Sequence, residues 1–323
     1  MPPGSLPHER SGYRPASRRP LLAPWHIVGY RAAVSEPSIM NHWRSVQDHS
    51  RSFWDFTYVY PVVSRRSKGL SIGINLNPDK VCNFDCVYCE VDRVTPPKTR
   101  AVNLLQVRAE LADMIQRAQS GQLAQDPKFA EAGDLTRQVR DIAFSGDGEP
   151  TMVDNFDDCV QAVVDVKRAA NLASTKIVLI TDAAGLDKAR VRAGLTLMDA
   201  HQGEIWAKLD AGTPEYFATV NRTHIRFERI LANLELTARH RPIIIQSLFL
   251  RLHGAPMPAS ELQAYCLRIQ ALLAAGARIL EIHLYTIARP TPVPWATRLD
   301  RATLESMASV IRESTGARVA VFE

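Results

Sequence analysis

The chain has 323 residues, of which 46% are hydrophobic and 23% charged, and a net charge of +5. This length fits one large α/β barrel or about two ordinary domains, and no apolar run approaches the ~20 residues that span a membrane. Five cysteines are too few for a disulfide-stapled secreted scaffold. The composition therefore excludes an integral membrane protein and favours a cytoplasmic protein in a reducing compartment.

The first 39 residues differ in composition from the rest of the chain. They contain five arginines, two glutamates and seven of the twenty prolines, so they carry +3 and leave only +2 for residues 40–323. A segment this rich in proline and arginine is predicted to be a disordered tail. We expect residues 40–68 to form an N-terminal arm and residues 69–323 to form the folded domain.

From residue 70 onward, strand-like and helix-like segments alternate. Strands are expected at Leu70–Leu76, Val139–Phe144, Lys176–Ile180, Glu204–Leu209, Ile243–Leu250, Arg278–Ile287 and Ala317–Phe322. Helices are expected at Asn103–Ala118, Phe156–Ala170, Asp187–Arg192, Ser260–Ala275 with Ser260 as N-cap, Thr303–Ser314, and once or twice within Pro214–Ala238. About six β-then-α units predict parallel strands with right-handed crossovers. The expected fold is a partial (β/α)6 barrel whose chemistry gathers at the carboxyl ends of the strands.

Three of the five cysteines lie in a loop just after the first expected strand. Cys82, Cys86 and Cys89 have the spacing C-x3-C-x2-C, whereas Cys159 and Cys266 lie on expected helices and are predicted to be core residues. Three thiolates this close can converge on one soft metal centre. Structural zinc is a weaker reading, because it requires four ligands that generally come in two pairs. Three cysteines without a partner pair fit an iron–sulfur cluster with one iron open to a small molecule.

A glycine-rich turn follows the second expected strand and reads Ser145-Gly146-Asp147-Gly148-Glu149-Pro150. Glycines allow backbone groups to approach another group closely. An ordinary strand-to-helix turn is the simpler interpretation of such a segment. Its position after the second strand, together with the cysteine spacing, favours a ligand-binding turn.

The two motifs together resemble those of the radical S-adenosylmethionine enzymes, which have C-x3-C-x2-C with an aromatic residue before the last cysteine. The resemblance implies that Cys82, Cys86 and Cys89 hold a [4Fe–4S] cluster whose fourth iron chelates S-adenosylmethionine. One electron from a flavodoxin- or ferredoxin-like donor would split the sulfonium bond, and the resulting 5′-deoxyadenosyl radical would abstract hydrogen from the substrate. The protein would supply binding, orientation and the exclusion of water.

The resemblance also implies roles for residues around the cluster loop. The backbone of Tyr88 would approach the adenine, and the turn from Gly146 through Asp147 and Gly148 to Glu149 would face the methionine ammonium. The familiar form of the turn is Gly-Gly-Glu-Pro, so Asp147 is a departure that adds a second acid.

Further candidates lie at the ends of later strands. Thr181 would meet the carboxylate or ribose of the cofactor, or simply cap a turn. Lys208 and Asp210 share a strand face, so Lys208 would bind the methionine carboxylate or pair with Asp210. His283 and Tyr285 also share a face, and would line the site or pack.

Over residues 55–300 the chain is most similar to the wybutosine-synthesis group of iron–sulfur oxidoreductases. The tRNA-modifying members carry a second cluster on three further cysteines, and only Cys159 and Cys266 remain here. The substrate is thus left open between tRNA, a protein and a small metabolite. The alternative function is a non-catalytic zinc- or cluster-bearing RNA-binding protein, suggested by the net charge and by the aromatic segment 53–61 followed by Arg65, Arg66 and Lys68. The proline-rich loop 288–295 is either a substrate wall or a rigid connection.

Overall fold

The computed structural model describes residues 51, 53–64, 66–92, 96, 101–289 and 291–322. These residues belong to one compact unit that spans residues 38–323. The expected tail over residues 1–39, and the arm up to residue 50, lie outside the described residues.

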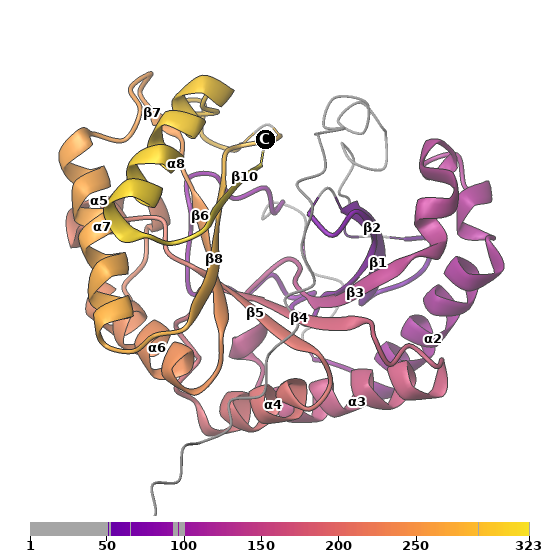
Figure 1. The fold of residues 1–323 in the computed structure, drawn as a ribbon. Helices are drawn as coiled ribbons and strands as arrows, with labels where there is room; N and C mark the ends of the chain where they lie inside the picture. The colour runs from indigo at the N-terminus through magenta and orange to yellow at the C-terminus, as the bar shows by residue number, and fades with distance from the viewer. Residues whose placement is uncertain are drawn as a thin grey trace, which may run out of the picture. The chain divides into compact units, whose positions relative to one another are not determined.

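One eight-stranded sheet forms the centre of this unit. Its strands are β1 (Val59–Ser64), β2 (Gly69–Ile74), β3 (Val139–Phe144), β4 (Lys176–Thr181), β5 (Gly203–Lys208), β6 (Ile243–Leu248), β8 (Ile279–Tyr285) and β10 (Val319–Phe322). The strands lie in the sheet in the same order as in the chain. Only the β1–β2 pair is antiparallel, and every other neighbouring pair is parallel. Figure 1 shows the sheet curling into an open barrel, as expected from the sequence.

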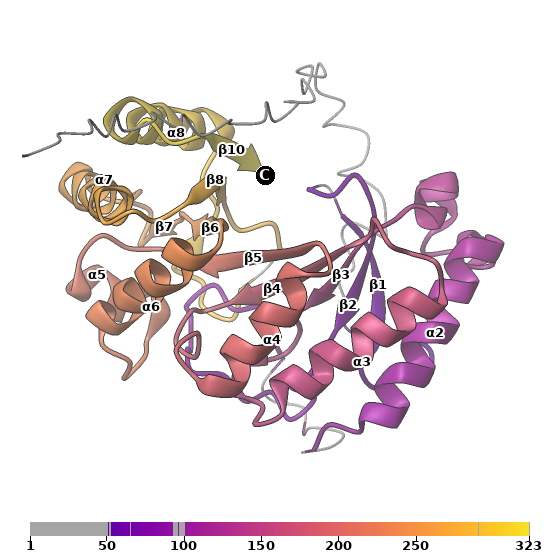
Figure 2. The ribbon, with the colours of Figure 1, turned by 60° about the horizontal axis from the view of Figure 1, so that its bottom comes forward.

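The helices follow the outer side of the curled sheet (Figures 1 and 2). They are α2 (Leu104–Ser120), α3 (Phe156–Ala169), α4 (Ala189–Asp199), α5 (Pro214–Asn221), α6 (Phe227–His240), α7 (Ala259–Ala274) and α8 (Arg301–Thr315). Short 3-10 helices occur at η2 (Leu123–Gln125), η3 (Ala130–Arg137) and η4 (Pro150–Met152), and β7 (Arg251–Leu252) pairs with β9 (Ala296–Thr297). No described helix is both long enough and apolar enough to cross a bilayer.

The expected strands are all present, and two of the expected helices need correction. The helix expected at Asp187–Arg192 is instead α4, which continues to Asp199 because Leu195 and Met198 extend its buried face. Helix α7 begins after Pro258, so Ser260 lies within its first turn and is not the N-cap. The segment Pro214–Ala238 contains two helices, separated where Arg222 adopts a φ of +43°.

The aromatic segment 53–61 is packed onto the barrel. Phe53, Phe56, Tyr58 and Tyr60 are buried, whereas Trp54 is 60% exposed and contacts the Arg117 guanidinium, 4.1 Å from its ring centre. The Glu110 carboxylate on α2 accepts hydrogen bonds from three consecutive backbone N–H groups, those of residues 57, 58 and 59. This anchors β1 as the edge strand of the sheet, and the four buried rings of the segment are not accessible for stacking on bases.

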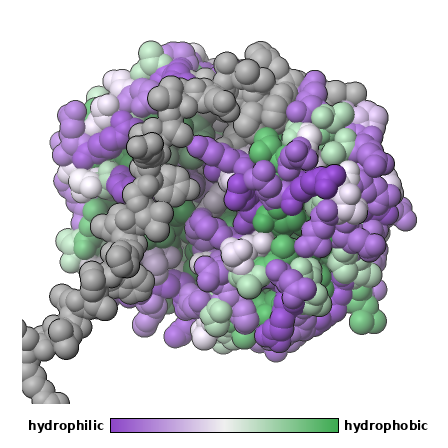
Figure 3. Space-filling model, turned by 45° about the vertical axis from the view of Figure 1, so that its right-hand side comes forward, coloured by the Kyte–Doolittle hydropathy of each residue, from purple (hydrophilic) through white to green (hydrophobic). Residues whose placement is uncertain are grey.

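The hydrophobic core lies between the sheet and its helices and includes Cys159 and Cys266, as expected. A second, small apolar group lines the inner side of the sheet and consists of Ala143, Val178, Trp206 and Ile244. On the surface shown in Figure 3, hydrophobic residues lie in small groups between hydrophilic ones. On the inner side of the sheet, apolar and polar side chains together line a cavity.

Candidate functional site

A cavity of about 340 Å³ lies between the inner side of the sheet and the loop that contains the three cysteines. All ten site residues predicted from the sequence line it: Cys82, Cys86, Tyr88, Cys89, Gly146, Asp147, Gly148, Glu149, Thr181 and Lys208. They come from the ends of β2, β3, β4 and β5. Because those strands are parallel, their carboxyl ends meet at one edge of the sheet.

The cysteine loop is fixed by its backbone. The amide of Asp85 donates to the carbonyl of Asn221 at 3.1 Å, the amide of Val87 donates to the carbonyl of Val220 at 2.9 Å, and a turn joins Cys89 to Cys86 at 2.9 Å. The Asn221 side chain also donates to the Cys86 sulfur at 3.4 Å. The end of α5 thus supports the loop from behind.

The three thiols share the cavity, and burial disfavours the thiolate form of two of them. Burial raises the pKa of Cys82 to about 12 and that of Cys86 to about 11. Within the described ranges, no three Cys, His, Asp or Glu side chains form a group that could hold a metal ion as they stand. Three soft sulfur donors around one cavity fit an iron–sulfur cluster chemically. Binding it requires the thiols to draw together and lose their protons.

The glycines of the turn allow it to contact the cysteine loop directly. A Cβ on Gly148 would lie 1.9 Å from the carbonyl oxygen of Val81, and a Cβ on Gly146, whose φ is +152°, would lie 2.4 Å from the Asn75 side-chain oxygen. The amide of Glu149 donates to the same Val81 carbonyl at 3.1 Å. From the sequence we expected the glycines to let a ligand approach closely, whereas in the structure they let the cysteine loop approach the turn.

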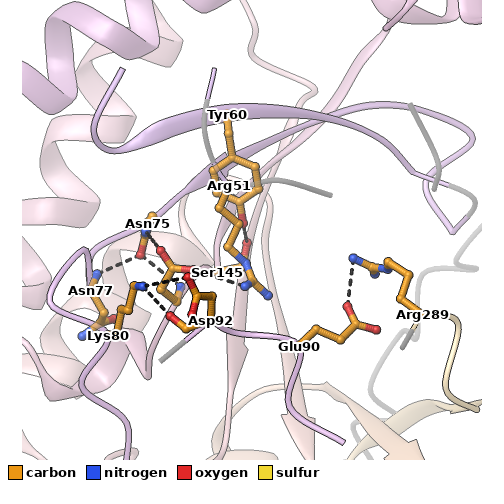
Figure 4. Close-up of polar contacts among 10 residues, drawn as sticks. Arg51, Tyr60, Asn75, Asn77, Lys80, Glu90, Asp92, Ser145 and Arg289 are labelled. Atoms are coloured by element: carbon orange, nitrogen blue, oxygen red, sulfur yellow. Dashed lines mark hydrogen bonds and ion pairs between the residues drawn. The ribbon is translucent and has the colours of Figure 1, made fainter. Parts of the chain in front are cut away.

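Asp147 holds the start of the cysteine loop. Its carboxylate accepts from the Asn75 amide at 2.7 Å and pairs with Arg51 at 3.2 Å, while its own amide donates to the Asn75 side chain at 3.1 Å. In Figure 4, Arg51 approaches this group, and the Tyr60 hydroxyl lies against Ser145 at 2.9 Å. The second acid of the turn is thus used within the protein.

Glu149 is buried and accepts four hydrogen bonds. One carboxylate oxygen accepts from the Thr151 amide at 3.0 Å and from the hydroxyls of Thr151 and Thr181, both at 2.7 Å. The other accepts from the Asp182 amide at 2.7 Å. Thr181 in turn accepts from the amide of Ala183 at 3.1 Å. The carboxylate therefore joins the ends of β3 and β4, and Thr181 acts as a cap on its turn.

Lys208 and Asp210 are bridged by Tyr88 and are not directly paired. The Lys208 ammonium donates to the Tyr88 hydroxyl at 3.1 Å, and that hydroxyl donates to Asp210. Burial lowers the pKa of Lys208, but neighbouring Tyr285, Asp210 and the two thiols of Cys86 and Cys89 raise it more, so the ammonium stays charged. A buried cation therefore faces the cysteine loop.

The end of β8 and the loop that follows it also contribute to the cavity. Tyr285 lines the cavity, whereas the His283 ring packs against Trp206 and Phe322 at 5.1 Å from each ring centre. In the loop after β8, Arg289 pairs with Glu90 of the cysteine loop at 2.8 Å, and the two side chains face each other in Figure 4. The proline-rich loop thereby reaches the cavity with Ala288 and Arg289.

The sequence argument missed two buried polar residues in this region. Asp182 lines the cavity, and one of its carboxylate oxygens has no hydrogen-bond partner in the described part of the chain. Burial and the neighbouring Glu149 raise its pKa. Its position directly after Thr181, at the end of a strand, could have indicated a site residue, because the other candidates also lie at strand ends. Asn221 gave no such signal, because it is the last residue of helix α5 and is 135 residues away from Cys86 in the chain.

Comparison with solved structures identifies the fold. TYW1 with a lysine–pyruvate adduct bound matches with a TM-score of 0.51 at 14% identity, over 77% of this chain and 74% of that one. SuiB from Streptococcus suis bound to S-adenosylmethionine matches with a TM-score of 0.51 at 10% identity, over 80% of this chain and 52% of that one. At these identities the matches show the fold, and the partial barrel expected from the sequence is confirmed.

Curated relatives match parts of the chain. UPF0026 protein slr1464 of Synechocystis sp. is 27% identical over 183 residues, which are 56% of this chain and 59% of that protein. A Brachyspira hyodysenteriae protein named GTPase Obg is 26% identical over 62% of this chain and only 25% of its own length. A UPF0026 protein of Helicobacter pylori is 30% identical over 32% of this chain and 29% of that protein. The matches span between a quarter and three fifths of these relatives, and no protein-family model matches the chain.

Proposed function

We propose that this chain is a radical S-adenosylmethionine enzyme that carries one [4Fe–4S] cluster on Cys82, Cys86 and Cys89. The observation that carries the proposal is the convergence of three thiols and the Gly-Asp-Gly-Glu-Pro turn on one cavity, at the carboxyl edge of a half-barrel of the radical S-adenosylmethionine type. When bound, the cluster would supply the electron that splits the sulfonium bond of S-adenosylmethionine.

The chain's own residues would bind and orient the cofactor. Lys208 offers a buried positive charge for the methionine carboxylate, and the unpaired oxygen of Asp182 offers an acceptor for its ammonium or for a ribose hydroxyl. Glu149 and Asp147 support this role indirectly, because their carboxylates fix the turn against the cysteine loop. Tyr88 keeps Lys208 in place through its hydroxyl.

The RNA-binding alternative loses its main support. Four of the five aromatic rings, those of residues 53, 56, 58 and 60, are buried in the barrel, which leaves Trp54 as the exposed ring among them, in contact with Arg117. Rings that stack on bases have to be accessible. We therefore do not propose RNA binding through this segment.

Anaerobic reconstitution tests the proposal. The full chain should take up about four irons and release 5′-deoxyadenosine from S-adenosylmethionine under reducing conditions. Cys86→Ala should lose both properties, whereas the core variant Cys159→Ala should keep both. One zinc per chain, or a Cys86→Ala variant that keeps the cluster spectrum and the cleavage, would contradict the proposal.

A further inference from the structure

Two buried hydrogen-bond donors on the wall of the cavity have no partner. Arg66 lies in the turn between β1 and β2, and its Nη1 atom is buried without a hydrogen-bond partner among the described residues. The same holds for the side-chain nitrogen of Gln246 on β6. Both residues line the cavity described above. Buried donors are nearly always satisfied in proteins, so these two require an explanation.

The two donors lie close to the same part of the wall. The Arg66 guanidinium carbon is 4.9 Å from the ring centre of Trp206 and 5.4 Å from that of Tyr285. Strand β6 lies between the strands that carry these rings. Gln246 is opposite Lys208 on one side and His283 on the other, so it is one inward-facing position from each ring. A guanidinium held between the rings therefore lies over Gln246.

Burial lowers the pKa of the Arg66 guanidinium more than the nearby Tyr285 and Asp141 raise it, so its charge is only partly offset within the described part of the chain. The nearby Asp141 carboxylate accepts from the hydroxyls of Ser67 and Ser71, one on each oxygen. No described acid forms an ion pair with Arg66, and burial lowers the pKa of its guanidinium. Keeping a guanidinium in such a place is costly unless an anion joins it. Without a bound anion, the Trp206 and Tyr285 rings hold the Arg66 guanidinium in a fixed orientation.

We propose that Arg66 and Gln246 bind a carboxylate group of the enzyme's substrate, which identifies the substrate as a small organic acid. The planar fork of a guanidinium matches a carboxylate with two parallel hydrogen bonds, and the Gln246 amide adds a third donor. A cavity of about 340 Å³ is at the small end for ligand sites. This assignment rests on the proposed function, because that function makes the cavity a substrate site.

The subsite lies apart from the groups assigned to the cofactor. Tyr285 interacts electrostatically with Arg66 and also with Lys208 and Cys86. Tyr285 is therefore near both the guanidinium and the cysteine loop. A substrate held by its carboxylate at Arg66 would extend its other end past Tyr285 toward the cysteines.

Calorimetric titration of the reconstituted full chain with malonate tests the inference, with uncharged malonamide as the matched ligand. Malonate should bind and malonamide should not. Arg66→Gln should weaken malonate binding at least about tenfold, the usual effect of a lost charged hydrogen bond, and Gln246→Leu should weaken it less. Arg239→Gln, which alters an exposed arginine paired with Glu235 on α6, should bind malonate like the natural chain.

Several results would overturn the inference. They are failure of malonate to bind the natural chain, equal binding by Arg66→Gln, and tighter binding of inorganic phosphate than of malonate. The inference would also be overturned if Arg66→Gln bound S-adenosylmethionine more weakly and S-adenosylmethionine competed with malonate. Arg66 would then bind the cofactor and not the substrate. If Arg66→Gln does not fold by thermal melting, Gln246→Leu decides the outcome. Malonate binding without any formation of 5′-deoxyadenosine would sink the proposed function and leave the carboxylate subsite standing.

Discussion

Two regions of the same cavity treat their polar groups in opposite ways. At the rim, defined here as Asn75, Asp147, Glu149, Thr181 and Asp182, nearly every polar atom is bonded to another part of the chain. On the inner wall, Arg66 and Gln246 keep buried donors without partners. The rim groups build the surface that carries the cysteine loop, whereas the wall groups are left for a ligand. A motif can therefore mark a site without most of its side chains contacting the ligand.

The largest effect is expected from closing the gap between the turn and the cysteine loop. Gly148→Ala would place a methyl group 1.9 Å from the Val81 carbonyl oxygen, so the loop has to move. We expect iron content after reconstitution to fall to that of Cys86→Ala. Gly133→Ala is the control, because it introduces the backbone strain of a positive φ (+48°), which Gly148 lacks, but its Cβ would have no neighbour within 4 Å. If Gly148→Ala binds iron normally, the glycine does not serve the loop.

Removing the Glu149 carboxylate from the rim should have the next largest effect. Glu149→Ala leaves four donors from Thr151, Thr181 and Asp182 without their acceptor. We expect the free energy of unfolding to fall by about 3 kcal/mol, measured by urea denaturation before any cofactor is added. Glu313→Ala, at an exposed position on α8, should change it by less than about 0.5 kcal/mol. Unchanged stability with lost S-adenosylmethionine binding would make Glu149 a ligand and not a support.

The smallest effect is expected at the Tyr88 bridge between Lys208 and Asp210. Tyr88→Phe removes the hydroxyl that accepts from Lys208 and donates to Asp210, and should cost about 1–2 kcal/mol of unfolding free energy. Tyr216→Phe is a matched control, since its buried hydroxyl has no hydrogen-bond partner in the described structure. Equal stability of the two variants in chemical denaturation would show that the bridge contributes nothing.

The sequence predicted the parts of the molecule that depend on local pattern. Every strand of the large sheet from β2 to β10 was expected, because buried apolar runs alternate with amphipathic segments, whereas the two-residue strands β7 and β9 were not expected. The cysteine spacing and the turn after β3 were legible for the same reason, as each motif lies within a few consecutive residues. Helix α4 was expected too short, because its last buried residues fall beyond a glycine, Gly194, that packs against Phe156.

The hydrogen-bond partners of the motif residues could not be predicted from the sequence. Asp147 bonds Asn75 and Arg51 across 72 and 96 residues, and no local pattern connects them. The reason for Gly148 was likewise misjudged, since the sequence shows that a side chain is missing but not what fills its place. Arg66 was noted only as one of several basic residues after an aromatic segment, and its burial depends on Trp206 and Tyr285, far along the chain.

The agreement between strand order in the sheet and strand order in the chain bears on how the protein folds. Each parallel strand pairs with the strand before it in the sheet order, so no strand has to be inserted between two strands that are already paired. The sheet can therefore grow from one edge by adding strands in chain order. The β1–β2 hairpin, which Glu110 fastens to α2, lies at one edge, and β10 forms the other edge.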